Sequence, residues 1–131
     1  MIGIDTNVLI RFFIVDDDPD QAVRAKTLAA TLSAGKPGYI STVTLAESVW
    51  VLQSLHRKQK NEIVEFIEVL LNSQQLVLEN PEAVAQAVGR FKASGSGFTD
   101  CLTERLCHLA GCHHTVTFDK GASKAAGMVL L

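Results

Sequence analysis

Four acidic residues in the sequence could together bind a metal ion: Asp5, Glu47, Asp100 and Asp119. Asp5 directly follows a short apolar run, and Asp119 directly follows another at residues 115–118. Clustered carboxylates repel one another unless a cation neutralises them, and a set of oxygen ligands favours hard cations such as Mg²⁺ or Mn²⁺. Such ions activate water and polarise phosphoryl oxygens. The four acids therefore predict phosphodiester hydrolysis.

Three of the acids also have an ordinary structural interpretation. Asp5 could cap the helix that follows it, and Asp119 could be a turn residue. Asp100 directly follows Thr99, where an aspartate in the first turn of a helix complements the helix dipole. For each of these residues taken alone, the structural role and the metal-binding role both stay open.

Glu47 has a more specific context. Its helical neighbours Val43, Trp50 and Val51 share one face, which predicts a carboxylate on the apolar side of a helix, with Trp50 in the core. Burying an unpaired carboxylate costs several kcal/mol or more, and residues 37–56 contain no Lys or Arg. A metal ion is therefore favoured over a distant ion pair as the partner of Glu47.

The predicted elements alternate between strands and helices, which indicates an α/β fold with a mostly parallel sheet covered on both faces. Strands are expected over residues 2–5, 38–40, 76–78, 115–118 and 128–131. Helices are expected over about 7–14, 19–33, 42–55, 61–72, 81–91 and 100–110. Ligands of open parallel sheets bind beyond the carboxyl ends of the strands, and Asp5 and Asp119 both stand at such ends.

The length of the chain indicates the number of domains, and its net charge favours some classes of function over others. A chain of 131 residues is expected to form one domain. Its net charge of −2 argues against a passive nucleic-acid binder, because phosphate neutralisation supplies much of the affinity of such proteins. The charge is compatible with an enzyme that concentrates acids at a metal site. Basic groups at 57–60, 90–92 and 120–124 could contact phosphates, or be solvated helix ends.

The sequence also indicates a compartment. The N-terminus has no basic region before an apolar core, as a signal peptide would, and no apolar run approaches the ~18 residues of a membrane span. The three cysteines are an odd number within a short stretch, which is a poor disulfide framework and suits a reducing cytoplasm. We therefore expect a cytoplasmic protein with no membrane partner.

Four segments carry a family resemblance: MIGIDTNVLIR at the N-terminus, ISTVTLAE ending at Glu47, FTDCL around Asp100 and HHTVTFDK around Asp119. In order and spacing they resemble the acidic motifs of PIN domains, and more narrowly those of VapC-type toxins of bacterial toxin–antitoxin pairs. The resemblance covers nearly the whole chain, and its first motif is the most specific.

The resemblance implies a fold and an activity. The fold is a three-layer sandwich in one PIN-like domain over residues 1–131, with a five-stranded mostly parallel sheet flanked by helices. Strands two and three lie on one side of the first strand, and strands four and five on the other. The activity is that of an endoribonuclease dependent on Mg²⁺ or Mn²⁺. Its acidic quartet is Asp5, Glu47, Asp100 and Asp119, supported by the polar residues Thr6, Asn7 and Thr117.

The resemblance also implies partners. VapC-type relatives cut structured RNAs such as transfer or ribosomal RNA, and a cognate antitoxin protein holds them inactive. We expect a homodimer, and an antitoxin segment that places an Arg or Lys near Glu47 and Asp100. The apolar anchors of that segment are expected against the first two helices and the helix over 42–55.

One departure from the family pattern keeps an alternative open. Many relatives carry a further acid three residues before the third, where this chain has Gly97, so one metal ion could replace two. Glu104 could assist, although a solvated helix position is the simpler interpretation. The alternative is a catalytically reduced PIN-like module that binds RNA or protein. A haloacid-dehalogenase-like phosphatase is disfavoured, because its second aspartate would stand where this chain has Asn7.

Overall fold

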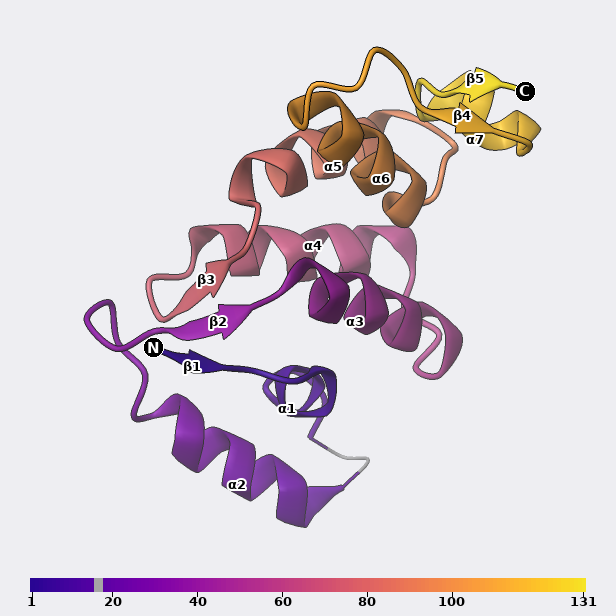
Figure 1. Ribbon diagram of the computed structural model, residues 1–131. Helices are drawn as coiled ribbons and strands as arrows, with labels where there is room; N and C mark the ends of the chain where they lie inside the picture. The colour runs from indigo at the N-terminus through magenta and orange to yellow at the C-terminus, as the bar shows by residue number, and fades with distance from the viewer. Residues whose placement is uncertain (16–17) are drawn as a thin grey trace. The chain divides into compact units, whose positions relative to one another are not determined.

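The computed structural model describes residues 1–15 and 18–131, which form two compact units, Met1–Glu79 and Asn80–Leu131 (Figure 1). Each unit has a core of its own and is described by itself. The sequence also favours a turn where three aspartates stand in a row at residues 16–18, and residues 16 and 17 of this expected turn lie outside the described residues. A single domain over residues 1–131 stays a prediction.

The first unit contains a three-stranded parallel sheet in the order β1-β2-β3. Its elements are β1 (Ile2–Gly3), α1 (Thr6–Arg11), α2 (Pro19–Ala29), β2 (Gly38–Ile40), α3 (Thr42–Ser54), α4 (Lys60–Asn72) and β3 (Leu76–Leu78). Gly38 pairs with Ile2 on one side and with Leu76 on the other, so β2 is the central strand. Parallel neighbours need a crossover connection, and the pairs α1–α2 and α3–α4 supply the two crossovers.

Close packing around β2 leaves no room for a side chain at Gly38. A Cβ atom there would lie 2.8 Å from Cγ1 of Ile4 and 3.0 Å from Cδ2 of Leu76. Ile4 is buried and β-branched, so its rotamer is restricted and it cannot readily move aside. Glycine at this position allows the side chains around the central strand to pack closely.

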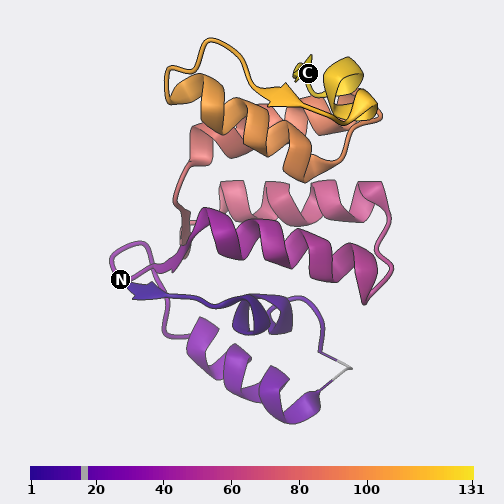
Figure 2. The ribbon, with the colours of Figure 1, turned by 45° about the vertical axis from the view of Figure 1, so that its right-hand side comes forward.

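The helices of the first unit pack through apolar faces. Helix α1 contacts both α2 and α3, and α3 lies beside α4 (Figure 2). The most buried apolar side chains on these helices are Leu9, Ile10, Leu45, Val49, Ile63, Ile67 and Leu70. Ser41 starts α3, since its Oγ accepts a hydrogen bond from the Thr44 N–H at 3.1 Å.

The second unit joins two long helices to a small sheet. Its elements are α5 (Pro81–Ala93), α6 (Phe98–Leu109), β4 (Val116–Thr117), α7 (Lys120–Ala125) and β5 (Val129–Leu130). Helix α5 packs on α6, where the rings of Phe91 and Phe98 meet edge to face with centroids 6.0 Å apart. Strands β4 and β5 are parallel, and α7, which the sequence did not predict, is their crossover.

The α/β class and the parallel direction of the strands are confirmed. The single five-stranded sheet stays a prediction, because the strands pair within each unit, three in the first and two in the second. None of the described helices is both long enough and apolar enough to cross a membrane.

Glu104 is buried, so the expectation that it is a solvated helix residue is wrong. Its side chain is 8% exposed and accepts hydrogen bonds from Nη1 of Arg90 at 3.0 Å and Nη2 of Arg105 at 2.8 Å. Nη1 of Arg90 also donates to the Ala126 carbonyl at 2.7 Å. Gly127 has φ +80°, and a Cβ there would lie 2.9 Å from that nitrogen. This charge cluster joins α5, α6 and the end of α7.

The cluster predicts a pH-dependent contribution to stability. Burial raises the pKa of Glu104, but hydrogen bonds and charge from Arg105 and Arg90 lower that pKa by more, so it lies below its usual value. The carboxylate therefore stabilises the fold above the unfolded pKa of about 4.3, and this contribution is lost as the pH falls through the lower folded pKa.

We expect Glu104→Gln, which keeps the size and removes the charge, to lower the free energy of unfolding by ~2 kcal/mol at neutral pH. This value is below the usual cost of breaking a buried pair because both arginines are partly exposed. Urea denaturation measures the effect, and the difference from the unsubstituted protein should shrink as the pH falls below about 4. Glu82→Gln, at an exposed position on α5, is the control. Equal stability of Glu104→Gln and the unsubstituted protein at neutral pH would contradict the account.

Candidate metal centre

Asp5 stands between β1 and α1, at the N-cap position of α1. Its carboxylate is exposed and makes no capping hydrogen bond, so the capping role considered from the sequence is not what this side chain does. The Ile4 N–H donates to the Tyr39 carbonyl at 2.9 Å, which fixes the chain directly before Asp5 to β2. Thr6, which follows, is buried. Asp5 is thus held at the carboxyl end of the sheet with its carboxylate available.

Glu47 lies on the exposed side of α3, so the prediction of a buried carboxylate is wrong. Val43 is 78% exposed and Trp50 is 60% exposed, which places the face that they share with Glu47 towards solvent. The face that packs inward is offset by one residue and carries Leu45, Ser48, Val49 and Leu52 among others. Burial therefore gives no reason for Glu47 to require a counter-ion, and Trp50 is not a core residue.

The two acids of the first unit nevertheless belong to neighbouring elements. Asp5 follows β1 and Glu47 lies in the helix that follows β2, and these strands are paired in parallel. Helices α1 and α3 are in contact, as Figure 1 shows within this unit. Because parallel strands end at the same edge of a sheet, both acids are carried by elements that leave from that edge.

Asp119 has a clear structural role in the second unit. It is the N-cap of α7, and its Oδ1 accepts a hydrogen bond from the Ala122 N–H at 3.0 Å. The Asp119 N–H donates to Oγ1 of Thr117 at 3.0 Å, so Thr117 fixes the backbone at the end of β4. One oxygen of the exposed carboxylate is engaged in the cap, and the other makes no hydrogen bond within the described residues.

Asp100 lies in the first turn of α6 and is half-buried. Thr99, which the sequence suggests as the cap of this helix, lies inside it, and Gly97 is the N-cap. A Cβ atom at Gly97 would lie 4.0 Å from Oδ2 of Asp100. An acid at position 97 would therefore lie directly beside Asp100. Because this chain has glycine there, Asp100 has no second carboxylate next to it from this position.

The four predicted acids are divided between the units, with Asp5 and Glu47 in the first and Asp100 and Asp119 in the second. Among the described residues, no group of three or more His, Cys, Asp or Glu side chains is arranged to hold a metal ion. The quartet as one site stays a prediction. Glu104 cannot supplement it without giving up its arginine partners.

The four carboxylates share a property that suits a cation. None of them forms a salt bridge with a described Lys or Arg, in contrast to Glu104, Glu62 and Asp20, which are paired. Carboxylate oxygens are the ligands that Mg²⁺ and Mn²⁺ prefer. The donor chemistry of the set therefore fits a divalent ion, with Asp5, Glu47 and Asp100 unengaged by other described groups.

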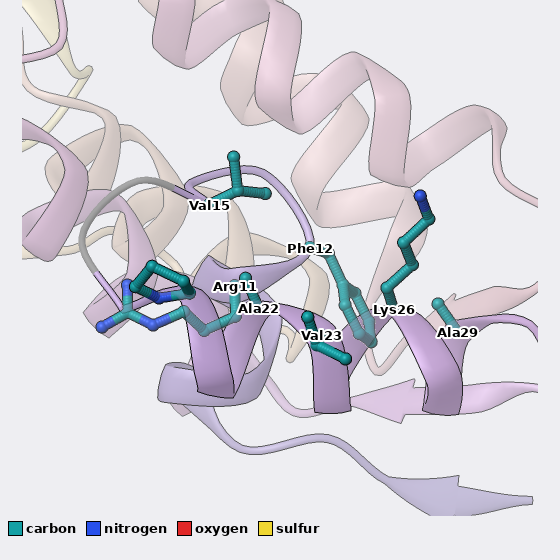
Figure 3. Close-up of a pocket in the computed structure, with 8 residues that line it drawn as sticks. Arg11, Phe12, Val15, Ala22, Val23, Lys26 and Ala29 are labelled. Atoms are coloured by element: carbon teal, nitrogen blue, oxygen red, sulfur yellow. The ribbon is translucent and has the colours of Figure 1, made fainter.

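A groove of about 720 Å³ lies between α1 and α2, apart from these acids. Phe12, Val15 and Val23 supply apolar walls. Figure 3 shows Phe12 and Val23 close together, with Arg11 to one side and Lys26 to the other. The groove is lined by apolar side chains with a basic residue on either side, and no predicted metal ligand lies in its wall.

The comparison with protein families decides the class of the chain. The model of the PIN domain matches residues 2–128, across both units. The chain belongs to the PIN-domain family. A comparison with curated proteins gives no match. PIN domains are typically metal-dependent nucleases.

The sequence did not reveal two features of this PIN domain near its acids. Trp50 and Phe118 are exposed aromatic residues close to Glu47 and Asp119. The spacing of residues in the sequence shows that Trp50 shares a helical stripe with Glu47. It does not show that this stripe faces solvent, because Thr44 and Ser48 are polar and the face of α3 that carries them therefore resembles an exposed one. Both Thr44 and Ser48 are buried.

Proposed function

We propose that this PIN domain is a ribonuclease of the VapC type that hydrolyses RNA with Mg²⁺ or Mn²⁺ held by Asp5, Glu47, Asp100 and Asp119. The observation that carries the proposal is the PIN match over residues 2–128, together with an acid at all four motif positions, none paired with a described base. Structured RNAs, such as transfer or ribosomal RNA, are the proposed substrates.

The residues of the chain have distinct parts in this proposal. The four carboxylates bind the ion, which activates water and polarises the phosphoryl oxygen. Thr117 fixes the backbone N–H of Asp119 at 3.0 Å. Thr6 and Asn7 support Asp5 from the first turn of α1. Since Gly97 lacks the further carboxylate of many relatives, we propose one bound ion rather than two.

We also propose that the working form contains one five-stranded parallel sheet. The three-stranded order β1-β2-β3 leaves one edge of β1 without a partner in its own unit, and β4 has one neighbour in its unit. Placing β4 beside β1 gives the order β3-β2-β1-β4-β5 that the family resemblance implies. This order would bring Asp5 and Asp119 to the same point, where the strand order reverses and ligands usually bind.

Cleavage should depend on the metal and on the quartet. We expect RNA cleavage by the purified chain with Mg²⁺ or Mn²⁺ and none in EDTA. Asp5→Asn should reduce cleavage by about 100-fold or more while leaving the melting temperature unchanged or higher, because it relieves repulsion between carboxylates. Glu82→Gln is the control with retained activity. Full activity in EDTA or in Asp5→Asn would contradict the proposal.

An antitoxin protein and a second copy of the chain are the proposed partners. The groove between α1 and α2 offers apolar walls for an anchoring segment, and an Arg of the partner near Glu47 and Asp100 would compete with the metal. Expression of the chain alone should arrest growth, and co-expression of the neighbouring gene should relieve the arrest. Harmless expression of an active nuclease would contradict this control, and sedimentation analysis tests the homodimer.

A further inference from the structure

The turn at the end of α6 brings two cysteines together. Gly111, with φ +94°, reverses the chain directly after the C-cap residue Ala110. The Gly111 N–H donates to the His108 carbonyl at 3.0 Å, and the Cys112 N–H donates to the Cys107 carbonyl at 3.0 Å. These two hydrogen bonds form a Schellman motif. Cys107 and Cys112 are its first and last residues.

The geometry of this turn suits a disulfide bond. The side chains at the first and last positions of a Schellman motif commonly contact each other. The hydrogen bond between the backbones of Cys107 and Cys112 keeps their Cα atoms within about 7 Å of each other, which is the limit that a disulfide can bridge. Both thiols are accessible to a small reagent, because Cys112 is exposed and Cys107 is half-buried.

The third cysteine has different surroundings. Cys101 lies earlier in α6 and is buried, and this burial raises the pKa of its thiol. Because the thiolate is the reactive form, Cys101 is poorly suited to exchange with a disulfide. The three cysteines of the chain thus divide into one adjacent pair and one buried thiol. No described group of three or more Cys, His, Asp or Glu residues is arranged for a metal ion, which favours a disulfide over a zinc site for the pair.

We propose that Cys107 and Cys112 form a reversible disulfide by exchange with the disulfide of a low-molecular-weight thiol, such as oxidised glutathione. The Cys112 thiolate attacks one sulfur of oxidised glutathione, which gives a mixed disulfide and releases one reduced glutathione. The Cys107 thiolate then attacks the Cys112 sulfur and releases the second. The two cysteines lose two protons and two electrons, and the glutathione disulfide takes up both.

The bond links two elements of the second unit. Cys107 lies in the last turn of α6, and Cys112 lies in the segment that leads from α6 into β4 (Figure 1). Oxidation therefore fixes the connection between the helix that carries Asp100 and the strand that precedes Asp119. Disulfides in a reducing compartment are usually transient and often sense the redox state, which agrees with a bond that forms by exchange. This inference goes beyond the proposed nuclease and does not depend on it.

Peptide mapping tests the bond directly. The folded, reduced full-length chain would be equilibrated with oxidised glutathione, then unfolded in iodoacetamide and digested with trypsin. Because trypsin cleaves after Lys and Arg, Cys107 and Cys112 fall in one peptide, residues 106–120, and Cys101 falls in another, residues 93–105. We expect the first peptide to be lighter by two hydrogen atoms and to carry no alkyl group, whereas Cys101 is alkylated. Dithiothreitol should restore both thiols of the pair.

A glycine substitution tests whether the turn places the two thiols. Gly111→Ala should lower the equilibrium constant for disulfide formation about 5-fold, or ~1 kcal/mol, because residues other than glycine disfavour the left-handed backbone. Gly111→Asn should retain most of it, since asparagine tolerates this conformation. Gly95→Ala is the matched control: a Cβ atom would meet nothing within 4 Å at either glycine, but only Gly111 of the two has a positive φ.

A serine variant separates an internal bond from modification of one exposed thiol. In Cys107→Ser, glutathione should stay attached to Cys112, because no neighbouring thiol displaces it. The same stable adduct on Cys112 of the unsubstituted chain, with Cys107 still reduced, would overturn the inference. A bond between Cys112 residues of two copies, seen as a doubled mass without reductant, would overturn it as well. Equal equilibrium constants in Gly111→Ala and Gly95→Ala would contradict the part given to the turn.

Discussion

Parallel pairing is the constraint on which the rest of the structure depends. Every strand pair in the described part of the chain is parallel, so each strand must be followed by a connection that returns to the opposite edge. In β1, β2 and β4 the chain leaves the strand directly into a helix. Asp5 and Asp119 are the N-cap residues between strand and helix, and Glu47 lies in the second turn of α3. The positions of these acids thus follow from the direction of the strands.

The two glutamates near the predicted motifs show how burial decides what a carboxylate can do. Glu104 is buried and its charge is balanced by Arg90 and Arg105, which commits it to holding three helices together. Glu47 is exposed and has no basic partner in the described residues, so it is available to a ligand. The same residue type is therefore committed to an ion pair in one helix and left available to a ligand in another.

The fold class could be predicted from the sequence because strands and helices alternate and because the acids follow apolar runs. The family resemblance agreed with the match to the PIN domain. The sequence could not predict which face of α3 packs inward. Thr44 and Ser48 on the buried face are polar, whereas Val43 and Trp50 on the exposed face are apolar. Helix α7 was missed because its six residues include Gly121 and Ser123, which are weak helix formers, and its start depends on the Asp119 cap.

The acidic quartet itself was identified by its motifs rather than by its surroundings. Asp5, Asp100 and Asp119 each have an ordinary position at the start of a helix, and only Asp119 uses its side chain as a cap. Local structure therefore does not distinguish a cap from a ligand at these positions, so the proposed metal-binding role of the four acids rests on the resemblance of their motifs to those of PIN domains.

The central claim is that acids from both units bind the same ion, and calorimetric titration of the full chain with Mn²⁺ tests it most directly. The account predicts one binding site that is lost in Asp5→Asn and equally in Asp119→Asn, although these residues belong to different units. Asparagine can still cap α7, so the second variant should remain folded. Unchanged Mn²⁺ affinity in either folded variant would contradict the account.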